Sequence, residues 1–182
     1  MNWLNTVLVL GTTFLAVFWE AAFGGVRQVL GAQIDLLPSL VVYASLCTGL
    51  TTVLLLSFLG GLWFDSLSAN PLGVSVLPLL VIGITIYLKR ELILRDQPFA
   101  QLVLGSCASA ITPLLSLSVL LTMGHSPHLG WGTLWQLAVM TAGGGFVTPI
   151  IFLLFERLER ALVHGRVAES SFRPDREIRR GR

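Results

Sequence analysis

Charged residues are scarce in this chain of 182 residues: they make up 12% of the sequence, whereas hydrophobic residues make up 54%. An average soluble domain has about 25% charged residues, and a short soluble chain must cover a large relative surface with polar groups. This composition excludes an ordinary soluble globular domain. We therefore expect lipid to surround most of the chain.

Residues that carry acid–base, nucleophilic or metal chemistry are also few. His125 and His128 lie three residues apart in a segment that contains glycine and proline, and His164 lies in a charged segment, so we expect no metal site. The sequence contains no Walker loop, dinucleotide fingerprint or nucleophile elbow. We therefore expect no catalytic residue, no cofactor and no enzymatic activity.

The chain has only two cysteines, Cys47 and Cys107, and both lie inside apolar runs. Free cysteine behaves as a small buried hydrophobic residue, so we interpret both as packing residues that indicate no redox compartment. Residues 1–5 carry no Lys or Arg, and no clear cleavage site follows them. The segment 3–23 is therefore interpreted as a retained first helix.

The few charges divide the chain into long apolar runs. Glu20, Arg27, Asp35 and Asp65 are the only charged residues outside two clusters, at 89–96 and 156–182. A stretch of about 20 mostly apolar residues crosses the hydrocarbon core as a helix. The pattern predicts an all-α polytopic membrane protein. The predicted transmembrane helices are 3–23, 33–46, 50–68, 72–88, 99–123 and 132–155.

The run 36–64 decides the number of spans. As one helix it would be roughly 44 Å long at about 1.5 Å per residue, whereas the hydrocarbon core is about 30 Å thick. A hairpin that turns near 47–51 gives two short helices and returns Asp35 and Asp65 to one interface, where water reaches both. Helix length therefore favours six transmembrane helices over five.

Basic residues indicate which side of the membrane holds the C-terminus. Lys89, Arg90, Arg95 and the arginines of 157–182 fall on one side, which the positive-inside rule makes cytoplasmic. Only Arg27 changes sides between six and five spans, so the charge rule does not choose between them. The side of the N-terminus stays open for the same reason.

The periodicity changes after residue 155. Residues 156–167 have apolar positions on one helical face and predict an amphipathic extension of the last helix, which completes a single transmembrane domain over 1–167. Residues 168–182 form an Arg-rich cytoplasmic tail that we expect to be disordered. The tail fits contact with anionic lipids, contact with an acidic protein, or an orientation signal alone. Its interleaved acidic residues argue against nucleic acid.

Small residues are candidates for close helix packing. Gly105 and Ser109 lie four residues apart in 99–123, Gly60 and Gly61 are adjacent, and 143–145 is a glycine triplet. Small residues let membrane helices approach closely. They predict either packing within this chain or a face that docks the membrane helix of a partner.

Three carboxylates, Glu20, Asp35 and Asp65, fall at the same ends of the predicted helices, away from the cytoplasm. Acidic residues inside membranes often mark ion or proton paths. Because these three lie at helix ends, we interpret them as ordinary interfacial groups. The alternative is a shared acidic mouth, neutralised by Arg27.

The segment between residues 35 and 89 carries the most specific pattern. It opens on Asp35-Leu36-Leu37-Pro38, continues through Phe58, Gly61 and Asp65, and then reaches Asn70-Pro71-Leu72-Gly73. The step Gly-x-x-x-Asp, with Leu-Gly following within eight residues, is its most distinctive part. With this pattern, and with its length and hydropathy, the chain resembles the bacterial rod shape-determining protein MreD family.

The resemblance implies a fold similar to the six-helix substrate-binding component of energy-coupling-factor transporters. It implies a non-enzymatic scaffold in the bacterial inner membrane, within the elongation complex that builds side-wall peptidoglycan. The implied partners are an MreC-like protein, an MreB-like filament, a RodA-like glycosyltransferase and a penicillin-binding transpeptidase. The other hypothesis is a small-molecule-binding membrane subunit of such a transporter, with a pocket lined by Glu20, Asp35 and Asp65.

The resemblance also implies roles for four residues. Gly61 would be a close-packing point, and the carboxylate of Asp65 would accept backbone N–H bonds from 66–70 or from the start of the next helix. Pro71 and Gly73 would set the entry into that helix.

Overall fold

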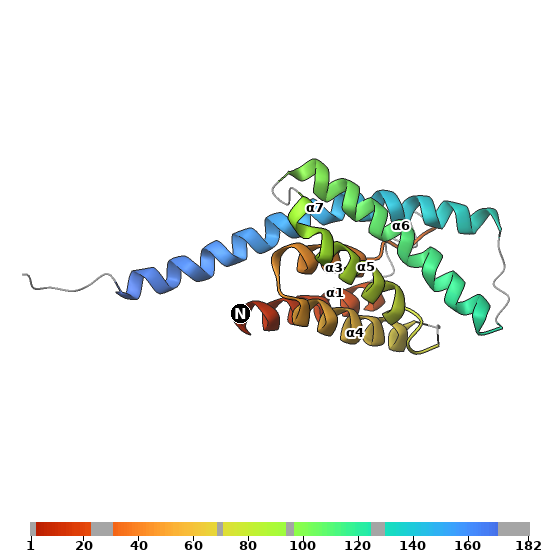
Figure 1. Ribbon diagram of the computed structural model, residues 1–182, viewed down its shortest axis with the longest axis horizontal. Helices are drawn as coiled ribbons and strands as arrows, with labels where there is room; N and C mark the ends of the chain where they lie inside the picture. The colour runs from red at the N-terminus through yellow and green to blue at the C-terminus, as the bar shows by residue number, and fades with distance from the viewer. Residues whose placement is uncertain (1–2, 23–30, 69–70, 94–96, 125–129, 171–182) are drawn as a thin grey trace, which may run out of the picture. The chain divides into compact units, whose positions relative to one another are not determined.

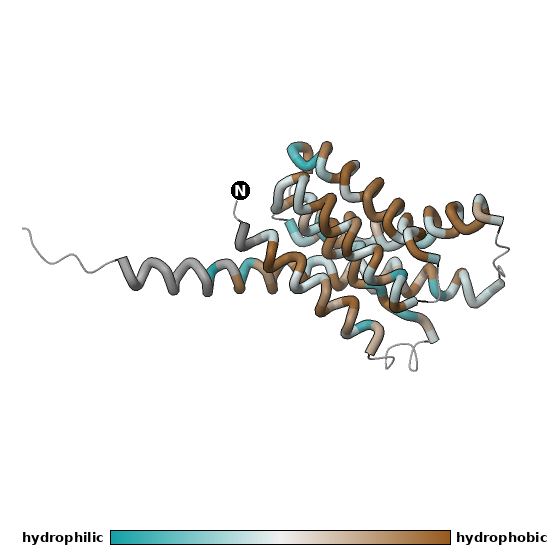
Figure 2. The backbone as a smooth tube through the Cα atoms, turned by 90° about the horizontal axis from the view of Figure 1, so that it is seen from below, coloured by the Kyte–Doolittle hydropathy of each residue, from teal (hydrophilic) through white to brown (hydrophobic). Residues whose placement is uncertain are grey.

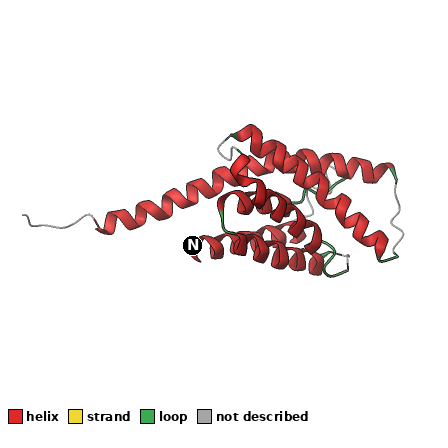
Figure 3. Cartoon of the chain, viewed as in Figure 1, coloured by secondary structure: helices red, strands yellow, loops and turns green. Residues whose placement is uncertain are grey.

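The computed structural model describes residues 3–22, 31–68, 71–93, 97–124 and 130–170. Every regular element in these ranges is a helix (Figures 1 and 3). The predicted all-α class is therefore confirmed for the described residues. The chain forms two compact units, Met1–Ile151 and Phe152–Arg182.

The helices of the described residues follow the apolar runs of the sequence, and apolar residues dominate them (Figure 2). By length and composition, α4, α6 and residues 131–158 of α7 can each cross a membrane. The elements in chain order are α1 (Trp3–Ala22), α3 (Leu37–Cys47), α4 (Leu50–Leu67), α5 (Val76–Lys89), the 3-10 helix η1 (Arg90–Leu92), α6 (Pro98–Thr122) and α7 (Trp131–Ser170).

The long run 36–64 is divided into two helices, α3 and α4. The backbone is extended at Thr48 and Gly49, which ends one helix and begins the next. The N–H of Thr48 donates to the carbonyl of Ala44 at 2.9 Å and closes the last turn of α3. At about 1.5 Å per residue, the 11 residues of α3 span roughly 16 Å, about half the hydrocarbon core.

Helices α4 and α5 are antiparallel and closely packed. The backbone of Gly61 in the second half of α4 lies against Val76 at the start of α5, and Gly83 in the middle of α5 lies against Val53 near the start of α4. Between these contacts, the Ser57 hydroxyl donates to a carbonyl of α5 at 3.3 Å. Helix α3 packs beside them and is buried from Leu37 to Leu46.

Helix α1 runs parallel to α4. The hydroxyls of Thr6 and Thr52 lie 2.9 Å apart near the two helix starts, and the rings of Phe14 and Trp63 meet edge to face at 5.2 Å further along. The ends of α1 and α4 therefore lie at the same end of the bundle as the starts of α3 and α5. We call this end the acidic end, because Glu20, Asp35 and Asp65 all belong to it.

The outward faces of the helices are apolar. Leu15 on α1, Phe58 on α4 and Ile150 on α7 are all more than half exposed. Apolar surface of this extent is unstable in water and is ordinary in contact with lipid. Burial inside the bundle and exposure outside it therefore agree with the membrane environment that the composition predicts.

Three predicted boundaries were wrong. Helix α3 begins at Leu37 rather than at 33, because residues 33–35 have no regular structure. Helix α5 begins at Val76 rather than at 72, because Gly73 has a φ of +96°, which a right-handed helix excludes. Helix α7 continues to Ser170, so residues 168–170 of the predicted disordered tail are helical. The rest of that tail lies outside the described residues.

Candidate functional site

Asp65 sits in the last turn of α4 and faces the turn that leads into α5. Its Oδ2 accepts the N–H of Gly73 at 2.8 Å and the N–H of Ser75 at 3.1 Å. The side chain is 1% exposed, and its Oδ1 has no partner among the described residues. The carboxylate thus fixes the backbone that precedes α5, where N–H groups have no partner inside the helix.

Gly61 lies one turn before Asp65 on α4. A Cβ atom on this glycine would lie 2.8 Å from the Cα and 2.9 Å from the backbone N of Val76. Pro71 opens the turn, and its carbonyl accepts the N–H of Val74 at 3.4 Å. We call Gly61, Asp65, Pro71, Gly73 and Ser75 together the α4–α5 joint.

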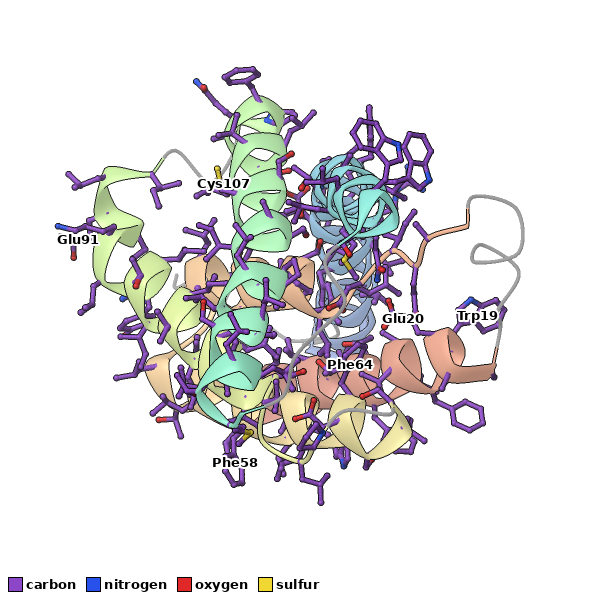
Figure 4. All side chains as sticks on the ribbon, turned by 90° about the vertical axis from the view of Figure 1, so that its right-hand side faces the viewer. Trp19, Glu20, Phe58, Phe64, Glu91 and Cys107 are labelled. Carbon is purple, nitrogen blue, oxygen red and sulfur yellow. The ribbon has the colours of Figure 1, made fainter. Side chains whose placement is uncertain are left out.

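Glu20 and Asp35 meet at the start of α3. Oε1 of Glu20 accepts the N–H of Leu36 at 2.7 Å, and Oδ1 of Asp35 accepts the N–H of Leu37 at 3.0 Å. Oε2 of Glu20 is buried and has no partner among the described residues. Figure 4 shows Glu20 turned toward the bundle and its neighbour Trp19 on the outside. Two carboxyl groups therefore cap one short helix.

The predicted exposure of these carboxylates was wrong for Asp35 and Asp65. Asp35 is 9% exposed and Asp65 is 1% exposed, because neighbouring helices cover both. Burial raises the pKa of Asp35 to about 6, and the hydrogen bond from Leu37 opposes this shift.

The three acidic residues do not form one site in the described structure. Asp35 lies near enough for its charge to act on Glu20, whereas Asp65 accepts its hydrogen bonds from Gly73 and Ser75 in the α4–α5 joint. Arg27, which the sequence proposed as their neutralising partner, lies outside the described residues. The candidate site is therefore a pair, Glu20 and Asp35.

The small residues of α6 pack against α7 within this chain. A Cβ atom on Gly105 would collide with the side chain of Thr148 and lie 2.7 Å from the carbonyl oxygen of Gly144. A Cβ atom on Gly144 would collide in turn with Ser109. Of the two roles that the sequence left open for Gly105 and Ser109, close packing inside the chain is the one seen here.

Sequence reasoning missed the hydroxyl groups that join α3 to α7. Oγ1 of Thr148 lies 3.0 Å from Oγ of Ser39, and that oxygen lies 3.3 Å from the carbonyl oxygen of Gly144. All three residues are buried. Isolated Ser and Thr in apolar runs were the available signal, but they occur throughout the chain, so the pattern did not single these two out.

Sequence reasoning used Arg90 for membrane orientation alone and missed its contacts within the bundle. Its Nη1 donates to the carbonyl of Thr48 at 3.2 Å, and its guanidinium lies 4.4 Å from the centre of the Tyr87 ring. Arg90 thereby caps the C-terminal end of α3. The basic residues that end α5 therefore lie beside the α3–α4 turn, opposite the acidic end.

In the part of the chain that the structure describes, no three His, Cys, Asp or Glu residues are grouped so that they could hold a metal ion. The groups brought together are hydrogen-bonding carboxylates, hydroxyls and closely packed glycines. No family model, curated protein or solved structure matches this chain.

Proposed function

We propose that this chain is a non-enzymatic scaffold of the MreD type in the bacterial inner membrane. It crosses the membrane six times and binds the membrane helix of an MreC-like partner, and so supports cell shape and side-wall peptidoglycan synthesis. The α4–α5 joint carries the proposal. Four of the residues that carry the resemblance, Gly61, Asp65, Pro71 and Gly73, belong to this one joint.

A scaffold needs a rigid body and an outward surface for its partners. The α4–α5 joint and the contact of Gly105 with Thr148 supply close packing inside the bundle. The large apolar side chains on the outside of α1, α4, α6 and α7 are exposed to a partner helix or to lipid. Packing of small and apolar surfaces is the main force between helices in a membrane.

The cytoplasmic side follows from the basic residues. We assign it to the end with Lys89 and Arg90, where an MreB-like filament would meet the protein, and the arginines of 157–182 predict the same side of the membrane for the C-terminus. RodA-like and transpeptidase partners would share the membrane with it. The Arg-rich segment after 156 would contact anionic lipid headgroups at this surface.

Depletion of the protein in its native cell tests the proposal. We expect rod-shaped cells to become round, and we expect the tagged protein to copurify with an MreC-like protein after mild solubilisation. Cells that keep their rod shape after complete depletion would contradict the proposal.

Two glycine substitutions sharpen this experiment. Gly61→Ala places a methyl group against the backbone of Val76, whereas Gly132→Ala on α7 meets nothing within 4 Å. We expect Gly132→Ala to restore shape in depleted cells and Gly61→Ala to fail or to restore it only partly. Membrane abundance of both variants is measured alongside, so that loss of the protein is distinguished from loss of the partner.

The Glu20–Asp35 pair favours a second candidate function, a small-molecule-binding subunit of an energy-coupling-factor-type transporter. A half-buried and a buried carboxyl group meet at the start of a short helix, and one oxygen of Glu20 has no partner among the described residues; this arrangement suits a ligand that donates hydrogen bonds. This candidate predicts copurification with a pair of ATPase subunits or with a bound small molecule. Glu20→Gln should lower the affinity for that small molecule and leave the binding of an MreC-like partner unchanged.

A further inference from the structure

The distal halves of α6 and α7, which we define as residues 113–122 and 131–142, bury no residue. On α6 the last buried residue is Thr112, and on α7 the first is Gly144. Every residue of α6 after Thr112, and every residue of α7 before Gly144, is at least partly exposed. The distal halves are therefore packed less closely than residues 98–112 of α6 and 143–151 of α7, which include the buried residues of the two helices in the bundle.

Both helices also lose a backbone hydrogen bond near the same level. Proline has no N–H, so Pro113 leaves the carbonyl of Ser109 without its usual donor, and Pro149 does the same for Gly145. These residues belong to the contact between the helices, where Ser109 meets Gly144. The weakened turn of α6 therefore lies beside the weakened turn of α7.

Side chains at this level do little to stiffen the backbone. The hydroxyl of Ser109 is buried and has no partner among the described residues, whereas Thr112 donates to the carbonyl of Ala108 at 2.8 Å. The glycine triplet 143–145 has the lowest helix propensity apart from proline. Sharp bends in helices occur at such proline and glycine positions.

We propose that α6 and α7 bend together at this level, so that their distal halves move relative to the bundle of α1, α3, α4 and α5. The movement reaches the acidic end through one contact. A Cβ atom on Gly143 would lie 2.8 Å from the side chain of Ile34, which precedes Asp35 in the chain. A hinge of this kind displaces the segment that leads into α3, whichever of the two functions the protein has.

Distances between spin labels in lipid nanodiscs test the hinge. Native Cys47 and Cys107 are replaced by Cys47→Ala and Cys107→Ala, and one label is placed at Leu15→Cys on α1. The second label is placed at Leu134→Cys in the distal half of α7, or at Ile150→Cys beyond the hinge; all three positions are exposed. We expect the distance distribution to Leu134→Cys to be at least about twofold wider than that to Ile150→Cys.

Proline replacements connect the movement to the hinge. Pro113→Ala and Pro149→Ala restore the missing N–H groups, so the wider distribution should narrow toward that of the Ile150→Cys pair. Pro78→Ala is the matched control, because Pro78 lies in the first turn of α5, where no N–H is needed. Equal widths for the two label pairs in the unaltered helices, or a wide distribution that persists without Pro113 and Pro149, would overturn the proposal.

Discussion

At the residue scale, Asp65 holds two backbone N–H groups that nothing else in the described structure bonds. Asp65→Ala leaves the half-buried N–H of Gly73 and the buried N–H of Ser75 unpaired, and we expect it to lower the free energy of unfolding by about 3 kcal/mol. Asp65→Asn keeps one acceptor oxygen in place and should cost less. Unfolding of the purified protein with increasing SDS in mixed micelles measures both changes.

A neighbouring residue supplies the control for Asp65. Ser66 is exposed, and its hydroxyl donates only to the carbonyl of Trp63 within its own helix. Ser66→Ala should change the free energy of unfolding by less than about 0.5 kcal/mol. If Asp65→Ala were as mild as Ser66→Ala, the α4–α5 joint would not depend on the carboxylate.

Asp35 makes the stability of the protein depend on pH. Burial raises its pKa from the ordinary value of 3.8 to about 6. Between these values the folded protein holds a proton that the unfolded chain has released, so the free energy of unfolding falls as the pH rises through this window. The contribution is fully present below the lower value and lost above the higher one.

The pH dependence is tested by SDS unfolding at several pH values across this window. Asp35→Asn cannot titrate, so we expect a flatter dependence in this variant. Glu91→Gln, at an exposed position in η1, should keep the slope of the unaltered protein. An unchanged slope in Asp35→Asn would show that another group causes the dependence.

At the element scale, the pairing of α6 with α7 depends on residues that lack bulk. Gly105→Ala puts a methyl group against the Gly144 carbonyl and the Thr148 side chain, which forces the helices apart and should cost about 1–3 kcal/mol. Gly11→Ala on α1 has no neighbour within 4 Å and should be neutral or stabilising. SDS unfolding compares the two, and equal effects would show that close approach at Gly105 contributes nothing.

The helices could be predicted from the sequence, whereas the carboxyl pair at α3 could not. Apolar runs and the extended backbone at Thr48 and Gly49 belong to local stretches of chain, so their positions follow from composition and length. The bond from Leu36 to Glu20 joins residues 16 positions apart. No local pattern indicates such a contact. The charge of Asp35 suggested that water surrounds its side chain, whereas packing buries it.

The start of α5 was missed for a related reason. Proline commonly occupies the first turn of a helix, so Pro71 indicated a helix from 72 onward. The bonds from Asp65 to Gly73 and Ser75 instead hold a turn with a left-handed glycine, and the helix begins only after it. Here a tertiary contact overrides the local preference for a helix start at proline.

At the scale of the whole molecule, helix direction connects the packing to membrane topology. Helix α1 runs parallel to α4, α5 runs antiparallel to α4, and the turn at Thr48 and Gly49 reverses the chain between α3 and α4. A single helix over 36–64 could not contain this reversal. This reversal supports the six-span proposal, and the start of α1 lies at the same end of the bundle as Arg90.

Reporter fusions test this topology directly. Green fluorescent protein at the N-terminus should fluoresce, because it folds in the cytoplasm and fails to fold after export through the general secretion pathway. Alkaline phosphatase, which is active only outside, should be active when fused after Ser68 and inactive when fused after Leu92. The fusion after Ser68 is the control for membrane insertion, since an exported position must give activity. A dark N-terminal fusion, present at normal abundance, would place the N-terminus outside and favour five spans, because an odd number of crossings would then separate it from the C-terminus, which the positive-inside rule predicts to be cytoplasmic.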